Sequence, residues 1–333
     1  MTYHREMGAQ EITEDVDLCL PGGKLNPQAV GFTRKPLHRS NLRGWGRNKR
    51  WDYWGIVSPR FVLGMTVADL DYAHLSQLYL YDREDNREIV TDAAAIGPGD
   101  VLLPDGLPPL VVMEDNDKTK LRFLDESDQT IVKASSKHLE VNLTVGPGGE
   151  SLGVVVPWSK RRFQYTLKDV ARPVSGTIAI DGTTHDLNAR DSFAVLDRGR
   201  GKWPYAMTWN WATGSGITDG KRLGLQMGGK WTDGTGVTEN GIFVDGRLTY
   251  WGDELEWSYE ASSKTAPWHV RGERVDATLT PFHLRHASSN FGLIASSTYQ
   301  AFGTWTGHAV DEAGIRHSLD GLTGWAEQAK NRW

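Results

Sequence analysis

The sequence predicts an all-β protein, and three observations support this fold class. Helical periodicity is scarce, whereas short runs of alternating apolar and polar residues recur along the 333-residue chain. Asp-Gly occurs six times and Asn-Gly once between these runs, and both dipeptides tolerate the positive φ angles of tight hairpin turns. Glycine (37) is abundant, and tryptophan (14) outnumbers tyrosine (10) and phenylalanine (9). Because so many strands must close on themselves or stack as sheets, we expect a barrel whose aromatic side chains line a ligand cavity.

The expected strands can be assigned in chain order. In the first half they are Ile56–Thr66, Gln77–Tyr81, Leu121–Leu124 and His138–Val145. Three hairpins follow: Val174–Ile180 with Thr183–Leu187, Tyr205–Ala212 with Leu223–Met227 across a glycine-rich connection, and Val237–Val244 with Arg247–Trp251. The last strands are Arg274–Thr280, Gly292–Ser297 and Phe302–Val310. Only the tail, Gly324–Arg332, has weak helical character.

Composition excludes several classes of protein. With 39% hydrophobic and 24% charged residues the chain is too apolar for a disordered protein. No apolar run approaches the roughly 20 residues of a membrane helix, and charges stand where a signal peptide needs its apolar stretch. The single cysteine, Cys19, excludes an internal disulfide and a cysteine-based zinc site. A net charge of −5 argues against a nucleic-acid binder. We therefore expect a soluble cytoplasmic protein.

The densest aromatic stretch runs from Asp197 to Ala212, with the sequence D-R-G-R-G-K-W-P-Y-A-M-T-W-N-W-A. By strand alternation Tyr205, Trp209 and Trp211 face one side, together with Met207. Asp197 and Arg198 lie next to glycines, so their polar groups can approach a ligand. The stretch predicts either a pocket wall with an acid at its rim or a core strand with a structural Asp–Arg pair.

Two further carboxyls interrupt apolar segments. Glu239, in Thr238-Glu239-Asn240-Gly241, precedes alternating apolar residues. A carboxyl that points into an apolar cavity has a raised pKa and can donate a proton, although Glu239 can equally be a solvated turn residue. Asp69 follows the aromatic run Trp51-Asp52-Tyr53-Trp54 and breaks an apolar strand. It is either an inward polar group, with Trp54 in the same pocket, or a strand-end acid before a turn.

Other candidate sites are weaker. His283 and His286 have the spacing of helical metal ligands, but in a strand an offset of three places them on opposite faces. No phosphate-binding, dinucleotide-binding or nucleophile-elbow motif is present, so neither a metal nor a cofactor is expected. Residues Arg34–Arg50 hold seven Lys or Arg and no acid. This segment is either a solvated surface arm or a contact for RNA or an acidic ligand.

The segment Gly176–Gly228 resembles the signature of the carotenoid hydratase and AttH-like superfamily. The matching pieces are Asp197, Trp203, Trp209-Asn210-Trp211, Asp219-Gly220 and Leu223–Met227. The C-terminal segments Tyr299–Gly307 and Gly321–Glu327 resemble its closing strand pair. From about Gly31 to the end, the chain is also similar to a bacterial family known as a domain of unknown function. The motif Asp197-Arg198-Gly199-Arg200-Gly201-x-Trp203-Pro204-Tyr205 and the downstream Thr238-Glu239-Asn240 carry that similarity.

The resemblance implies two consecutive lipocalin-like antiparallel β-barrels. The glycine-rich stretch Gly228–Gly236 is the expected seam, which gives an N-terminal barrel with its arm over residues 1–230 and a C-terminal barrel over 231–333. Members of the superfamily hydrate carotenoid double bonds, hydrate a prenylated isoflavonoid or guide cyclisation of polyketide-derived compounds. The hydratases carry an Asp between the paired tryptophans, where this chain has Asn210. A proton donor would therefore have to be Asp197, Glu239 or another carboxyl.

Two hypotheses from different classes follow. The first is a cofactor-independent hydratase or hydro-lyase for a hydrophobic small molecule, with a cyclase or isomerase as a variant. Asp197 or Glu239 would be the acid, Arg198 and Asn240 would orient groups, and Trp203, Tyr205, Trp209, Trp211, Asp69 and Trp54 would contact the substrate. The second hypothesis is a carrier of apolar ligands, which needs the aromatic wall but no buried acid.

Overall fold

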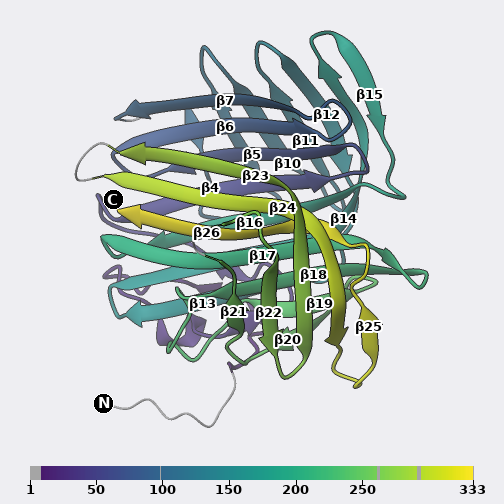
Figure 1. Ribbon diagram of the computed structural model, residues 1–333. Coiled ribbons are helices and arrows are strands. Elements are labelled where there is room, and N and C mark those ends of the chain that lie inside the picture. Colours follow the sequence, from purple (N-terminus) through teal and green to yellow (C-terminus); the bar gives the residue numbers. More distant parts are fainter. Residues whose placement is uncertain (1–8, 98, 261–262, 291–293, 333) are drawn as a thin grey trace.

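The protein consists almost entirely of antiparallel strands. The computed structural model describes residues 9–97, 99–260, 263–290 and 294–332. Within these residues, two large curled sheets of 14 and 10 strands account for most of the chain, and a single-turn 3-10 helix, η1 (Pro27–Ala29), is the only helical element (Figure 1). A small parallel pair joins β1 (Val16–Asp17) to β3 (His38–Arg39) in the N-terminal segment. The predicted all-β class is confirmed.

Apart from β1 and β3, the first sheet contains the strands up to residue 202. They are β2 (Phe32–Thr33), β4 (Asn48–Val57), β5 (Phe61–Asp69), β6 (Ala73–Asp82), β7 (Arg87–Ile96), β8 (Val101–Leu102), β9 (Val111–Asp115), β10 (Lys120–Asp125), β11 (Thr130–Ser135), β12 (Leu139–Val145), β13 (Leu152–Ser159), β14 (Arg162–Ile180), β15 (Thr183–Leu187) and β16 (Phe193–Lys202). Their order is β7-β6-β5-β4-β16-β14-β12-β11-β10-β9-β8, with β13 and β15 also paired to β14 and β2 paired to β13.

The second sheet contains the remaining strands. They are β17 (Ala206–Thr218), β18 (Lys221–Gly229), β19 (Asn240–Val244), β20 (Arg247–Trp251), β21 (Glu256–Ser258), β22 (Trp268–Gly272), β23 (Val275–Asn290), β24 (Ala295–Val310), β25 (Arg316–Ser318) and β26 (Thr323–Arg332). Their order is β20-β19-β18-β17-β26-β24-β23-β22-β21, with β25 on β24. The chain passes from one sheet to the other at residues 203–205, whereas the division into domains at residue 230 stays a prediction.

Three hydrophobic cores follow from the alternation of side chains along these strands. One core fills the curl of the first sheet, where Trp54 on β4 meets Phe123 on β10 at a ring distance of 6.4 Å. Another fills the curl of the second sheet around Trp268 and Trp305. The third lies between the sheets and includes Trp211 and residues from both sheets. Figure 1 shows β26, β24 and β23 lying alongside β4 and β5 at this junction.

The turn dipeptides form hairpins where the sequence predicts them. Asp181 and Asp245, which precede Gly182 and Gly246, adopt positive φ angles of 48° and 50° and connect β14 to β15 and β19 to β20. Asp219, with a φ of 53°, connects β17 to β18 in the same way. The glycine-rich residues before Asp219 therefore belong to strand β17, whereas the sequence suggested that they form a connection. Most other expected strands lie within observed ones, and residues 292–293 of the predicted Gly292–Ser297 strand lie outside the described residues.

Two element predictions are wrong. Ile56–Thr66 is not one strand but parts of β4 and β5, because Ser58 closes a tight turn with hydrogen bonds between its side chain and Phe61. The tail is not helical, since β26 pairs with β17 on one side and β24 on the other. A Cβ at Gly324 would collide with the Thr213 carbonyl, so this glycine permits the close pairing. No helix among the described residues is long and apolar enough to cross a membrane.

Candidate functional site

A cleft of about 720 Å³ lies between the facing surfaces of the two sheets. Its walls come from β4 to β7, β14 and β16 of the first sheet and from β17, β23, β24 and β26 of the second. Along β4, Trp51 and Tyr53 point into it, whereas Asp52 and Trp54 point to the opposite face. The sequence predicts a cavity inside a barrel, but the observed cleft lies between the two curled sheets.

A buried lysine joins two carboxylates at the inner end of this cleft. Lys168 Nζ lies 2.9 Å from Asp197 Oδ1 and 3.4 Å from Glu239 Oε2. It also lies 4.3 Å from the centre of the Trp211 ring. The lysine side chain is only 4% exposed. Burial lowers its pKa, but the two carboxylates raise it by more, so the net shift is upward. Lys168 is therefore a fixed cation that organises the acids.

Asp197 is held by donors from both of its neighbouring strands. Thr166 Oγ1 donates to its Oδ1 at 3.1 Å and Trp51 Nε1 donates to its Oδ2 at 3.2 Å. The side chain keeps 12% of its surface exposed and lines the cleft. The predicted acid at the rim of the aromatic wall is thus present, and Lys168 rather than Arg198 is its cationic partner.

Glu239 lies deeper than Asp197. Trp231 Nε1 donates to Glu239 Oε1 at 2.7 Å, and the residue is 1% exposed. A Cβ at Gly228 would collide with the Glu239 carboxyl, so the absence of a side chain there makes room for the acid. Burial raises the pKa of Glu239 to about 7, against the opposing effect of Lys168. Glu239 can therefore carry a proton at neutral pH.

A third carboxyl, Glu327 on β26, was not singled out from the sequence. Trp209 Nε1 donates to Glu327 Oε1 at 2.9 Å, and the acid lines the same cleft opposite Trp211 in the β17–β26 register. Burial raises its pKa to about 7. The sequence shows an acid, Glu327, within the segment that forms β26. We did not consider it because we expected this segment to be helical.

The aromatic wall consists of tryptophans from distant segments. Trp203 stacks on Trp231 with ring centres 5.9 Å apart and meets Trp209 edge to face at 5.7 Å. Trp211 meets Tyr53 edge to face at 5.6 Å. Trp209 and Trp211 line the cleft, as the strand alternation predicts, and Trp203 lines it as well, whereas Tyr205 is exposed outside it. The indole N–H groups mostly bond to polar side chains, which leaves the ring faces to form the apolar surface.

The glycines of the D-R-G-R-G motif have a steric role. On β16 Asp197, Gly199 and Gly201 face the cleft side, and a Cβ at Gly199 would collide with the Trp51 ring paired opposite it. Gly201 makes room for Gln164 in the same way. Alternation of glycine with arginine therefore gives β16 one flat face that seats an indole and one charged face.

We expect Gly199→Ala to destabilise the protein by about 1–3 kcal/mol, because the Trp51 ring must move to accommodate the methyl group. Urea unfolding followed by tryptophan fluorescence measures the loss. Gly22→Ala is the matched control, since a Cβ there meets nothing within 4 Å, and its effect should stay within about 0.5 kcal/mol. Equal stability of the two variants would contradict the packing role of Gly199.

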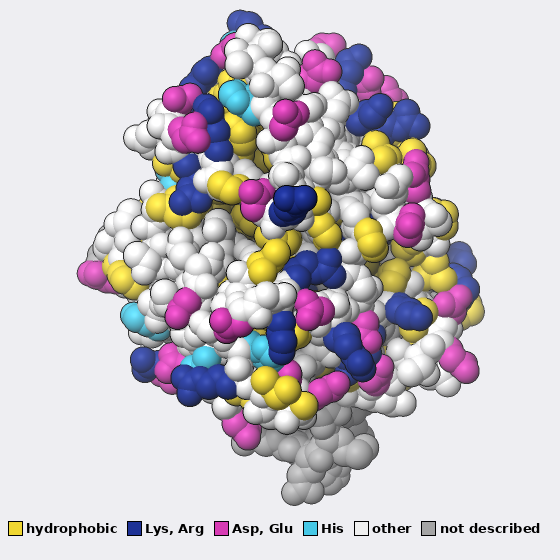
Figure 2. Space-filling model, turned by 90° about the vertical axis from the view of Figure 1, so that its right-hand side faces the viewer, with side chains coloured by type: hydrophobic (Ala, Val, Ile, Leu, Met, Phe, Trp, Pro, Cys, Tyr) yellow, Lys and Arg dark blue, Asp and Glu magenta, His cyan; other side chains and the backbone are white. Residues whose placement is uncertain are grey.

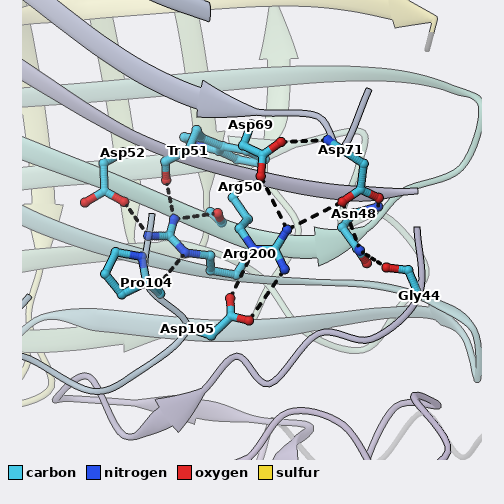
Figure 3. Close-up of polar contacts among 11 residues, drawn as sticks. Gly44, Asn48, Arg50, Trp51, Asp52, Asp69, Asp71, Pro104, Asp105 and Arg200 are labelled. Carbon is cyan, nitrogen blue, oxygen red and sulfur yellow. Dashed lines mark hydrogen bonds and ion pairs between the residues drawn. The ribbon is translucent and has the colours of Figure 1, made fainter. Parts of the chain in front are cut away.

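The charged face of β16 points away from the cleft. Arg198 Nε and Arg200 Nη2 each donate to Asp52 at 2.8 Å, and Asp52 is fully buried. Figure 3 shows Arg200 also reaching the carbonyls of Trp51 and Pro104, beside the network in which Arg50 contacts Asp69, Asp71 and Asp105. Arg198 is therefore half of a structural ion-pair group and does not orient a ligand at the cleft.

Three other predicted site residues also lie outside the cleft. Asp69 accepts the backbone N–H of Asp71 and lies 3.7 Å from Arg50, which matches the interpretation as a strand-end acid. Asn240 accepts the N–H of Gly228 and donates to the Asp253 carbonyl, so it fixes the backbone around Glu239. Trp54 is fully buried in the core of the first sheet. Strand alternation places Asp69 and Trp54 on the face of the first sheet opposite to the one that carries Asp197.

The basic segment Arg34–Arg50 is held to the body by ion pairs. Arg39 lies 2.6 Å from Asp15, Arg34 lies 3.1 Å from Glu150, and Arg50 lies 3.1 Å from Asp105. Lys49 is buried and donates to the Leu70 carbonyl. Over the face in Figure 2, Lys and Arg side chains intermix with Asp and Glu. The segment is therefore held to the body of the protein, and its last three residues belong to β4, between β5 and β16, rather than to a solvated arm.

The histidines and the cysteine have separate surroundings. His283 stacks on Tyr81 and contacts Glu88, whereas His286 stacks on Tyr299. No group of three or more His, Cys, Asp or Glu side chains within the described residues is placed to hold a metal ion. Cys19 is buried, and burial raises the pKa of its thiol to about 11.

We expect the acids of the cleft to make stability fall as pH rises. A carboxyl whose pKa is raised from 4.5 to about 7 binds its proton more tightly in the folded state. Its stabilisation is complete below the ordinary pKa and is lost as pH rises through about 7. Urea unfolding at pH values from 5 to 8 should show a smaller decline for Glu239→Gln than for the wild type. The exposed Glu256→Gln control should keep the wild-type slope, and parallel slopes for all three proteins would contradict this expectation.

The fold and the cleft together define a protein of two lipocalin-like β-barrel units with an acid-bearing, tryptophan-lined cleft between their sheets. The chain belongs to the family described as Domain of unknown function (DUF2804), whose model matches residues 9–333. This confirms the resemblance to a family of unknown function that the sequence suggested. A comparison with curated proteins gives no match.

Three solved structures share the fold. An AttH-like protein from Nitrosomonas europaea is similar with a TM-score of 0.55 and 15% identity, over 85% of this chain and 92% of that chain. Kievitone hydratase from Nectria haematococca is similar with a TM-score of 0.51 and 10% identity, over 86% of this chain and 89% of that chain. CghA in complex with Sch210972 is similar with a TM-score of 0.53 and 12% identity, over 86% of this chain and 88% of that chain. These likenesses confirm the two-barrel fold predicted from the resemblance.

Proposed function

We propose that the protein is a cofactor-independent enzyme of the hydratase or hydro-lyase type that acts on a hydrophobic small molecule. The observation that carries this proposal is a protonatable buried carboxyl, Glu239, next to a second carboxylate, Asp197, on the wall of a tryptophan-lined cleft. Proton transfer to carbon needs an acid that still holds its proton near neutral pH. A pKa of about 7 for Glu239 meets this requirement.

The geometry supports a division of roles in the hydration direction. Glu239 donates its proton to one carbon of a C=C bond, and a cation develops on the neighbouring carbon. The indole faces of Trp209 and Trp211 stabilise that cation. Water adds its oxygen to the cation and gives a proton to Asp197, so the product gains one molecule of water in total. Lys168 contacts both carboxylates and keeps them together, and the proton taken up by Asp197 returns to Glu239 before the next turnover.

Glu327 is a second candidate acid in the same cleft. Its contact with Trp209 Nε1 places it on the tryptophan wall, and Lys168 and Asp197 influence its pKa as they influence that of Glu239. A substrate lying against the wall would therefore meet more than one acid. A cyclase or isomerase would use the same wall and one of these acids, with the shape of the cleft holding the reacting carbons together. The fold shared with kievitone hydratase supports a reaction of the hydratase type.

Conversion of a panel of terpenoid, prenylated aromatic and polyketide-like alkenes in D₂O would test this proposal. Hydration adds one D₂O, with one deuterium bound to carbon, and mass spectrometry detects both changes. Isomerisation adds carbon-bound deuterium without water. Tight binding of the same compounds, seen as tryptophan quenching, with no conversion of any of them would favour a carrier and overturn the enzymatic proposal.

A further inference from the structure

Arg285 places a positive charge on the wall of the cleft. It lies on β23 opposite Gln300 of β24, is half-buried, and lines the cleft. Its guanidinium lies 4.2 Å from the centre of the Tyr79 ring, which comes from β6 of the other sheet. Tyr79 in turn stacks on Phe302 with ring centres 5.7 Å apart, so Arg285 contacts an aromatic pair that joins the two sheets.

The Arg285 guanidinium has this aromatic contact but no acceptor. Within the described residues it forms no hydrogen bond and no ion pair with another side chain or carbonyl. A contact with the face of a ring uses none of the five N–H donors of a guanidinium, so these donors remain available to a ligand in the cleft. Glu327 lies close enough for the Arg285 charge to lower its pKa, but the two side chains form no ion pair. A partly buried cation without a direct partner is costly for the free protein, and an anionic ligand would reduce that cost.

The acids nearest to this part of the cleft are already occupied. Glu88 accepts a hydrogen bond from Tyr79 Oη at 2.8 Å and contacts His283 Nε2 at 2.6 Å. Asp92 accepts from Gln77 Nε2 at 2.6 Å. Glu327 accepts from Trp209. These three carboxylates thus have their own hydrogen-bond donors, whereas the N–H donors of Arg285 can all bind an acceptor on a ligand.

The lining around Arg285 is polar, in contrast to the tryptophan wall. Small hydroxyl side chains from β23 and β24 extend the cleft past it: Ser288, Ser289, Ser296 and Thr298. We propose that the substrate is an amphipathic anion, a hydrophobic molecule whose carboxylate binds Arg285 while its apolar part lies against the tryptophans near Glu239. The inference rests on the proposed function and assigns Arg285 as a specificity-determining residue for the substrate class.

A matched pair of probes tests the inference, namely all-trans-retinoate and retinol, which have the same apolar part and quench tryptophan fluorescence. We expect the wild type to bind retinoate at least about 10-fold more tightly than retinol, since a charge-assisted bidentate contact discriminates by that order. Arg285→Met should abolish this preference and leave retinol binding unchanged. Arg285→Lys should retain part of it, because a lysine keeps the charge but loses the planar fork.

Arg83→Met is the matched control. Its guanidinium also stacks on an aromatic ring, 4.2 Å from the centre of Phe282, but it does not line the cleft. The preference for retinoate should survive in this variant. Equal affinity of the wild type for the two probes would overturn the inference and leave the proposed chemistry standing, as would an unchanged preference in Arg285→Met. Failure of both probes, or of retinoate alone, to bind the wild type would also overturn the inference, whereas the proposed chemistry is tested separately by the conversion experiment in D₂O.

Discussion

Glu239→Gln is expected to lower the turnover of any hydrated or dehydrated substrate by about 100- to 10,000-fold, which is the usual contribution of a positioned general acid. Glutamine keeps the size and can keep the contact with Trp231 Nε1, but it has no acidic proton to donate. Ligand binding, measured by tryptophan quenching, should change little because the tryptophan wall is intact. The wild type should also lose activity as pH rises through about 7, where Glu239 loses its proton.

Glu114→Gln is the matched control for this prediction. Glu114 is also buried and burial also raises its pKa, but it lies away from the cleft, near Asn116. Its replacement should leave turnover at the wild-type level. Asp197→Asn and Glu327→Gln, tested in parallel, identify which carboxyls share the chemistry. Full turnover in both Glu239→Gln and Asp197→Asn would refute the assignment of the acid.

Asp52→Asn is expected to destabilise the fold by about 3–5 kcal/mol, because removing one partner from a buried ion group leaves uncompensated charge. Asp52 is fully buried and accepts from both Arg198 and Arg200. Arg198 keeps only Asp125 at 3.4 Å, and Arg200 keeps only carbonyl acceptors. Such a loss is a large part of the roughly 5–15 kcal/mol that stabilises a folded domain. Equilibrium urea unfolding measures it.

An exposed ion pair provides the comparison. Asp276 pairs with Arg271 at 3.3 Å, and both side chains are more than half exposed. Asp276→Asn should therefore cost between 0 and about 1 kcal/mol. If Asp52→Asn proved no more destabilising than Asp276→Asn, the ion-pair group behind β16 would not have the structural role assigned to it.

Much of the candidate site could be anticipated from one stretch of sequence. Asp197, Trp203, Trp209 and Trp211 lie in a segment of 15 residues and all line the cleft. Strand alternation predicts a shared face for Trp209 and Trp211. Glu239 was recognisable as an acid before an apolar strand. The same reasoning could not decide whether Asp69 and Arg198 point into the cleft or away from it. Alternation shows which residues share a face of a strand, but not which of the two faces lines the cleft.

Lys168 and Glu327 were missed for a physical reason of the same kind. On β14, Gln164, Thr166 and Lys168 alternate with Phe163, Tyr165 and Leu167, a pattern typical of a strand with one face in water. Here the polar face is buried by the second sheet, so it forms the polar floor of the cleft instead. The pattern of polar and apolar residues in one strand does not show whether another sheet packs against the polar face of that strand.

The sequence by itself determined the all-β class, the hairpins at the Asp-Gly turns and the face of β17 that carries the tryptophans. Each of these depends on local physics, namely the φ angles that glycine and aspartate allow and the two-residue period of a strand. Only the tertiary structure decided that β26 is a strand, that the cleft lies between the sheets, and that Lys168, Glu239 and Glu327 meet there. These features depend on contacts between residues more than 30 positions apart, such as Lys168 with Glu239 and Trp209 with Glu327, and no local pattern encodes such contacts.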